Sequence, residues 1–146
     1  MRLSIATSLF AVIAISTVTL AVDVIKPSKI SKDEVTGKVF ERSNVVTTHN
    51  HGGTQLEAPI LLGSDRKFES GMYKAGANRF DIKEPYGVDE FMYFIKGSVK
   101  LTSSDGSVQT INAGDAVSIP KEWTGIWETD GYTKFYVIYH PAGLPE

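Results

Sequence analysis

Cysteine is absent from this 146-residue chain, and its absence removes several kinds of chemistry. Without thiols the protein can form no disulfide bond, no thiolate zinc site and no cysteine nucleophile. Basic residues are not in excess either, since fifteen Lys and Arg stand against seventeen Asp and Glu, for a net charge of −2. Nucleic-acid binding needs clustered Lys and Arg, so nucleic acid is not an expected partner. Phosphate loops, dinucleotide fingerprints and a Ser-His-Asp arrangement are also missing.

The first 21 residues are apolar or small, and Arg2 is their only charge. A positive start, an apolar run and small residues at Thr19 and Ala21 are typical of a secretory signal peptide cleaved after Ala21. An uncleaved anchor helix is the alternative, because the run approaches the roughly 20 residues that span a bilayer. Cleavage leaves fourteen basic and seventeen acidic residues, a net charge of −3. We therefore expect a secreted or periplasmic protein that has no membrane contact once the signal is removed.

Residues 22–67 are mixed and polar, and we interpret them as an N-terminal arm with loops. The stretch 35–41 could add one strand, whereas the Gly, Asn and Asp clusters of residues 46–67 favour turns and irregular loops. The expected domain follows at 68–140, and residues 141–146 form a C-terminal tail.

From Phe68 onward the chain changes to short alternating segments that are typical of β-strands. Asp105-Gly106 is a two-residue hairpin signal, because both positions tolerate a positive φ. Glycines at 97, 114 and 131 and Pro120 separate the other segments. The predicted strands span 69–74, 79–82, 89–96, 98–103, 109–111, 116–119, 124–128 and 133–139. With no helical periodicity after residue 21, this pattern predicts an all-β fold, a small antiparallel β-barrel or jelly roll whose interior can hold a cavity.

Several motifs in this region resemble the cupin superfamily. Residues 90–97 match the end of the first cupin motif, a glutamate followed after six residues by a glycine, and residues 114–120 match the start of the second, G-x5-P. The motifs E-S-G-M-Y (69–73), T-G-x-W-E (124–128) and K-x-Y-V-I (134–138) make the chain similar to the branch of the (S)-ureidoglycine aminohydrolase cupin domain, which is DUF861-like. The resemblance implies a jelly-roll barrel over about 68–139.

The same resemblance implies that the usual metal ligands are missing. Metal-binding cupins place two histidines shortly before the glutamate, and these places hold Glu84 and Tyr86 here. The histidine of the second motif falls on Gly125, so only Glu90 remains of the four ligands. A lone carboxylate is a poor site for a divalent transition metal. We expect no metal centre and no cofactor at this position.

Glu90 is the candidate catalytic or ligand-binding residue. Alternation places it on one face with Met92 and Phe94, and in a barrel lumen it could act as a general base or a hydrogen-bond acceptor. A structural carboxylate satisfied by Arg79 or a lysine is the alternative. The aromatic residues that could line the same pocket are Tyr73, Tyr86, Trp123 and Trp127. Each of them could instead belong to the core, and Trp127 could fill the space of the missing metal.

His49 and His51 form an H-x-H pair that would suit a metal if it lay on a strand and folded back to Glu90. Gly52 and Gly53 follow directly, so we expect an exposed loop instead, and we expect His140 to be exposed near the end of the chain. Asp105 and Asp115 are expected to make local turn hydrogen bonds.

Two functions remain open for this domain. The first is an exported small-molecule-binding or sensing module without a metal centre. The second is a cupin-type enzyme, a metal-dependent hydrolase or isomerase of a small organic acid, amide or ureido compound. A homodimer that pairs through its outer strands is possible in either case. The sequence identifies neither the ligand nor the oligomeric state.

Overall fold

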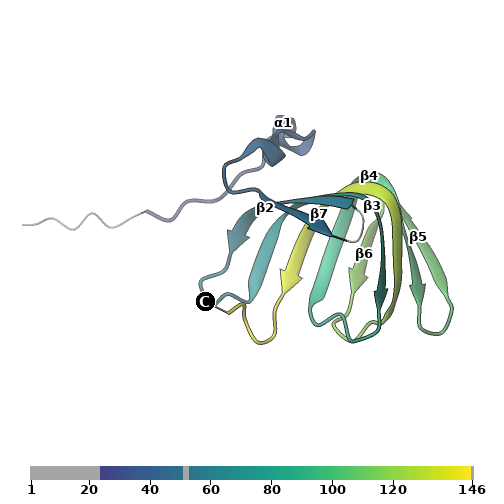
Figure 1. The fold of residues 1–146 in the computed structure, drawn as a ribbon. Coiled ribbons are helices and arrows are strands. Elements are labelled where there is room, and N and C mark those ends of the chain that lie inside the picture. The colour runs from purple at the N-terminus through teal and green to yellow at the C-terminus, as the bar shows by residue number, and fades with distance from the viewer. Residues whose placement is uncertain (1–23, 51–52, 146) are drawn as a thin grey trace, which may run out of the picture.

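The structure is a computed structural model that describes residues 24–50 and 53–145. The expected signal peptide at 1–21, and His51, lie outside the described residues. Seven strands form one antiparallel sheet in the order β1-β2-β3-β7-β4-β5, and β6 pairs with β4 off this path. The strands curve around a common interior, as Figure 1 shows. The prediction of an all-β antiparallel fold is confirmed, and no helix within the described ranges is long and apolar enough to cross a bilayer.

Seven strands make up the sheet: β1 (Val46–Asn50), β2 (Gly53–Leu62), β3 (Phe68–Ile82), β4 (Asp89–Ser103), β5 (Val108–Asn112), β6 (Ala116–Ile119) and β7 (Gly125–Tyr139). Residues 46–50 and 53–62, which we expected to lie in loops, instead form β1 and β2. Their pairing with β3 extends the sheet at one edge. Asn50 and Gly53, which belong to the cluster that caused the loop prediction, pair with each other at the end of the two strands.

Three strands are each 15 residues long and form the centre of the sheet. The sequence pattern divides each of them into two short strands, whereas the structure continues β4 through Gly97 and β7 through Gly131. Both glycines have a positive φ, at 71° and 131°. They lie in neighbouring pairs, Gly97 with Tyr132 and Gly131 with Ser98, between two shifts in the β4–β7 register. Glycine at such places lets a strand bend sharply and remain paired. The bends wrap the sheet around its interior.

Two apolar clusters lie on opposite faces of the sheet. The inner cluster lies inside the barrel and contains Phe94, Leu101, Trp127 and Tyr132, among others. It follows from the alternation of β4, in which every second residue from Glu90 to Phe94 is buried. The outer cluster is formed by Ala58 and Met72 of the sheet and by residues of the N-terminal arm.

The N-terminal arm (24–45) covers part of the outer sheet face with a short helix, α1 (Lys32–Val35), and a 3-10 turn, η1 (Lys38–Glu41). The strand considered for 35–41 is therefore wrong. A capping box explains α1, because Ser31 and Glu34 hydrogen-bond each other's backbone N–H groups. Val39 of η1 is fully buried against the sheet.

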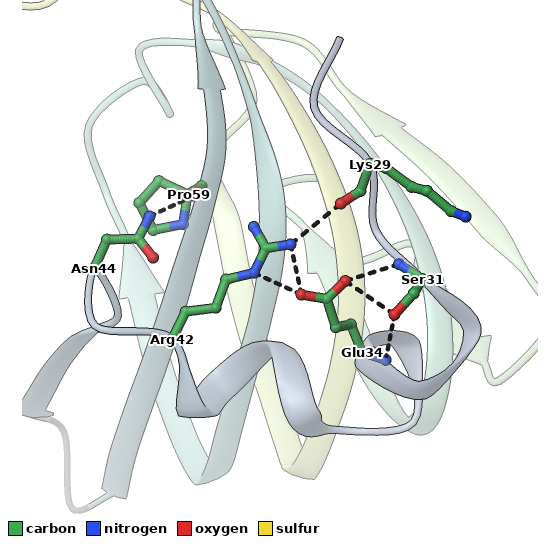
Figure 2. A network of polar contacts seen from close by, with 6 residues as sticks. All are labelled: Lys29, Ser31, Glu34, Arg42, Asn44 and Pro59. Carbon is green, nitrogen blue, oxygen red and sulfur yellow. Dashed lines mark hydrogen bonds and ion pairs between the residues drawn. The ribbon is translucent and has the colours of Figure 1, made fainter. Parts of the chain in front are cut away.

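Arg42 and Asn44 make polar contacts that hold the N-terminal arm in place. The Arg42 side chain binds Glu34 Oε1 through Nε at 2.7 Å and through Nη2 at 2.6 Å, and its Nη2 also donates to the carbonyl oxygen of Lys29 (Figure 2). Asn44 Nδ2 donates to the carbonyl oxygen of Pro59 in β2 at 2.9 Å. The arm is thus held to itself by polar contacts and to the barrel mainly by apolar packing.

Candidate ligand-binding pocket

A cavity of about 690 Å³ opens at one end of the barrel. Its wall contains aromatic rings from β3 and β7 and from the segment that precedes β4, together with four carboxylates, one of them from β4, and two lysines. The lining residues are Glu57, Tyr73, Phe80, Asp81, Ile82, Lys83, Glu84, Pro85, Tyr86, Glu90, Trp127, Tyr132, Lys134, Tyr136 and Ile138. Ligand sites commonly have volumes of about 300–1,000 Å³ and a mostly apolar lining with a few polar groups. The size and character of this cavity are those of a small-molecule site.

Glu90 lies in the wall of this cavity, on the inward face of β4, and is 4% exposed. Its Oε1 accepts a hydrogen bond from Lys134 Nζ at 2.6 Å, and its Oε2 accepts one from the hydroxyl of Tyr86. The predicted inward position is correct. The partner is a lysine, and Arg79 pairs instead with Glu128 on β7. Both carboxylate oxygens of Glu90 are therefore engaged within the protein.

Lys134 comes from β7 and is as deeply buried as Glu90. Besides Glu90, its ammonium group contacts Met92 Sδ at 2.8 Å. The nitrogen also lies over the rings of Tyr73, Trp127 and Tyr132, at 5.5, 5.3 and 5.7 Å from their centroids. These distances fall within the range of cation–π attraction. Lys134 is a buried cation held by a carboxylate, a thioether and three aromatic rings.

Three tyrosine side chains surround Glu90, and all three are held in the neutral form. Burial, followed by the charge of Glu90, raises the pKa of Tyr86. Burial likewise raises the pKa of Tyr73 and that of Tyr132. The Tyr86 hydroxyl donates to Glu90, whereas the hydroxyls of Tyr73 and Tyr132 donate to no acceptor in residues 24–50 and 53–145. The oxygen of Tyr132 interacts with the side chain of Trp127, which partly offsets the rise of the Tyr132 pKa. The cavity therefore offers two hydroxyl donors that the protein itself leaves unused.

A second series of polar contacts starts at the cavity wall and leads away from Glu90. The Tyr136 hydroxyl donates to Glu57 Oε1 at 2.7 Å and approaches Glu69 Oε1 at 3.4 Å. Glu69 Oε2 lies 3.1 Å from His140 Nε2. The expectation that His140 is exposed is wrong, because its side chain is only 15% exposed and packs against Glu69. The carboxylate of Glu57 is held by Tyr136 in the cavity wall.

The remaining candidate residues lie elsewhere. Trp123 does not line the cavity; its indole N–H donates to Ser103 Oγ at 3.1 Å, and its ring packs edge-on against Tyr86. His49 is exposed as expected, but it lies on strand β1 and not in a loop. Its Nδ1 contacts Thr54 Oγ1 across the hairpin, and it is not part of the cavity wall. Asp105 and Asp115 accept local turn hydrogen bonds from backbone N–H groups.

The residues around Glu90 do not fit a divalent metal ion. Within the described part of the chain, no cluster of three or more His, Asp or Glu side chains could hold one. The Tyr86 hydroxyl, at a position where metal-binding cupins have a histidine, bonds directly to Glu90. At Gly125, where the second motif would place another, a Cβ atom would lie 2.2 Å from the carbonyl oxygen of Thr102. The backbone there leaves no space for a histidine side chain unless β4 and β7 separate.

Lys134, Glu57, Tyr132 and Tyr136 were not among the sequence-predicted site residues. The sequence contains one indication that Lys134 faces the inside of the barrel. In the motif K-x-Y-V-I it alternates with Tyr136 and Ile138, so it shares their inward face. A charged residue on the buried face of the most apolar strand indicates a polar partner inside the barrel.

Comparisons with known proteins agree with this architecture. The family model described as EutQ-like cupin domain matches residues 62–136, just over half of the chain. A DUF861-family protein of unknown function from Pseudomonas syringae pv. tomato has a similar fold, with a TM-score of 0.59 and 19% identity. This match covers 66% of the present chain but only 44% of that protein.

Two further solved structures have the same fold. The EutQ protein of Clostridium difficile matches with a TM-score of 0.51 and 22% identity, over 68% of this chain and 78% of that one. The cupin domain of Schizosaccharomyces pombe Cnp3 matches with a TM-score of 0.51 and 9% identity, over 66% and 69% of the two chains. At these identities the likeness concerns the fold alone. Comparison with curated protein sequences gives no match.

Proposed function

Because this chain belongs to the family of EutQ-like cupin domains, we propose that it is a small-molecule-binding module whose ligand enters the open barrel and lies above the Lys134–Glu90 pair. The resemblance to the cupin superfamily is thereby confirmed. The observation that carries the proposal is the cavity of about 690 Å³, which combines an aromatic lining with two tyrosine hydroxyls that donate to no acceptor among the described residues. A pocket that served only as core would be filled by side chains.

The polar groups of the cavity favour a neutral ligand that carries both a carbonyl oxygen and N–H groups. The hydroxyls of Tyr73 and Tyr132 are protonated donors that can bind a carbonyl oxygen. Glu57 can accept from ligand N–H groups in addition to its bond with Tyr136. Four carboxylates against two lysines make the cavity formally negative, which disfavours a carboxylate ligand. Small amides and ureido compounds meet these requirements, and the likeness to the ureidoglycine aminohydrolase cupin points to the same class.

A binding experiment tests this function. Isothermal titration with a panel of small amides and ureido compounds, matched carboxylates and matched amines should show saturable binding of the first group only. Replacing Tyr132 by Phe removes one neutral hydrogen bond, so the Kd should rise by about fivefold, equivalent to about 1 kcal/mol. Tyr139→Phe is the control, since Tyr139 lies on the outer face and is 48% exposed.

Two results would contradict the proposal. The first is that no compound of the panel binds, and the second is that carboxylates or amines bind as tightly as amides. An equal change in Kd for both tyrosine variants would show that the ligand lies outside this cavity.

A metal-dependent hydrolase or isomerase is the alternative that the resemblance implies. The geometry supports it less well, because a general base needs a free oxygen facing the ligand and both oxygens of Glu90 are engaged. Incubation of the purified protein with any amide that binds should therefore release no ammonia above the Glu90→Gln background. Turnover that this substitution abolishes would establish the enzymatic function.

We further propose that the module acts outside the cytosol, on the basis of the apolar run and small residues before Val22. The expected form in the secreted or periplasmic fraction begins at Val22, which N-terminal sequencing would show. Retention of Met1 in a membrane fraction would identify an anchor instead.

A further inference from the structure

The carboxylate of Glu90 resembles a metal ligand of the cupin fold, yet a cation of another kind lies against it. Lys134 Nζ is 2.6 Å from Oε1 of Glu90, and the other oxygen accepts from Tyr86. We infer that the ammonium group of Lys134 is a built-in cation. It takes the place beside Glu90 that a metal ion has in metal-binding cupins. The barrel would then be organised around an internal organic cation, independently of any metal.

The surroundings of Lys134 Nζ are those of an organic-cation site. A carboxylate and a thioether contact the nitrogen directly, and three aromatic faces lie within 5.7 Å. Rings of this kind recognise ammonium groups through their negative faces, whereas a divalent metal requires several nitrogen or oxygen ligands. All of these groups come from β3, β4 and β7, so the central strands of the sheet build the site together.

The register explains why a lysine fills this site. Lys134 lies opposite Phe94 on β4, whereas Glu90 lies opposite Ile138, four residues further along β7. The side chain of Lys134 therefore runs along the barrel axis past Met92 to reach Glu90. Only a long unbranched side chain can deliver a cation from this position. Substitution by a short residue would leave the carboxylate and the three rings in place, with space for a small free ammonium ion.

Chemical rescue tests the inference. Lys134→Ala should lower Tm strongly, because it leaves Glu90 buried without its partner. Methylammonium chloride should then raise the Tm of this variant by at least about 3 °C relative to sodium chloride of equal ionic strength. Tetramethylammonium should be less effective, since it has no N–H to donate to Glu90. Wild type should not respond, and neither should the Glu90→Gln, Lys134→Ala double variant, in which the carboxylate charge is removed.

A folded Lys134→Ala variant that methylammonium does not stabilise would overturn the inference. If the variant does not fold under any condition, the wild-type protein decides the question through titration with Mn²⁺, Ni²⁺ and Zn²⁺ followed by elemental analysis. We expect no stoichiometric binding at Glu90. One divalent ion per chain that is lost in Glu90→Gln would show that Lys134 has not taken the place of the metal. Both readouts are independent of the ligand proposed for the open cavity.

Discussion

Glu34 is the residue on which the polar contacts of the N-terminal arm converge. Its carboxylate accepts from the backbone N–H of Ser31 at 2.8 Å, from the Ser31 hydroxyl at 3.0 Å and from Arg42 at 2.7 Å. The Ser31 backbone hydrogen bond, and after it Arg42, lowers the pKa of Glu34 from 4.5 to about 2. A depressed pKa means that these contacts stabilise the arm fully above pH 4.5 and are lost as the pH falls towards 2.

We expect the amide signals of the arm to keep their positions down to pH 4.5 and to shift or broaden between pH 4.5 and 2. Two-dimensional NMR of the ¹⁵N-labelled protein measures this directly. Glu34→Gln should loosen the arm already at neutral pH and remove the transition in this window. Glu41→Gln, an exposed glutamate of the same arm, is the control. Identical acid profiles for Glu34→Gln and wild type would contradict the assignment.

Single residues of the pocket were predictable where local alternation determines their direction. Glu90 alternates with Met92 and Phe94 along β4, and all three side chains point inward as predicted. The predicted residues Tyr73, Tyr86 and Trp127 line the same cavity as Glu90. Lys134, Tyr136 and Ile138 of β7 also alternate onto the inward face, but the partners of β7 are β3 and β4, which are far away in sequence. The contact between Lys134 and Glu90 depends on this non-local pairing, and therefore no local pattern reveals it.

At the scale of strands, Gly97 is where β4 bends across β7. Its φ is 71°, and a Cβ atom there would lie 1.9 Å from the carbonyl oxygen of Gly131. Gly106 of the β4–β5 hairpin has a similar φ of 84°, but no atom lies within 4 Å of its Cβ position. Alanine at either position incurs the left-handed strain of about 1–2 kcal/mol. Alanine at position 97 also requires the backbones of β4 and β7 to move apart, whereas alanine at position 106 does not.

We expect Gly97→Ala to lower the free energy of unfolding by at least about 2 kcal/mol more than Gly106→Ala does. Urea unfolding measures both values, and unchanged m-values would show that the two transitions are comparable. Equal destabilisation by the two substitutions would contradict this expectation, because it would mean that β4 and β7 can move apart at Gly97 at little cost in free energy.

These bends also explain how far the strands could be predicted. The turn at Asp105-Gly106 and the alternation on both sides of it gave the β4–β5 hairpin correctly. Glycine was interpreted as a strand end at 97 and 131, because a sequence does not distinguish a bulge within a pair from a turn between pairs. Strand β2 was missed because the Gly, Asn and Asp clusters of residues 46–67 were interpreted as loops. The strand also carries Glu57 and Gln55 on its inward face, where Tyr136 and Asn50 provide their hydrogen-bond partners only after folding.

At the scale of the whole molecule, the described residues 24–50 and 53–145 cover only part of the outer sheet face. The N-terminal arm packs on Ala58, Met72 and Phe135. Beyond it, the same face presents large apolar side chains that are 42–48% exposed, namely Leu61, Phe68, Phe91, Tyr93 and Tyr139. The register joins them into one patch, since Phe68 pairs with Tyr139, and Phe91 pairs with Val137. Contiguous apolar surface of this kind typically marks an association site.

We propose that a second copy of the chain is the partner of this patch. In a two-fold dimer the patch meets itself, and because its members carry no charge, the contact brings no like charges together. Sedimentation velocity should show a dimer in wild type and a monomer in Phe91→Lys, which would place two ammonium groups near the axis. Val108→Lys, at a still more exposed apolar position on β5, should remain dimeric. The pocket lies on the inner face, so Phe91→Lys should bind ligand as wild type does. A wild-type protein that is monomeric, or a dimer that persists in Phe91→Lys, would contradict the assignment.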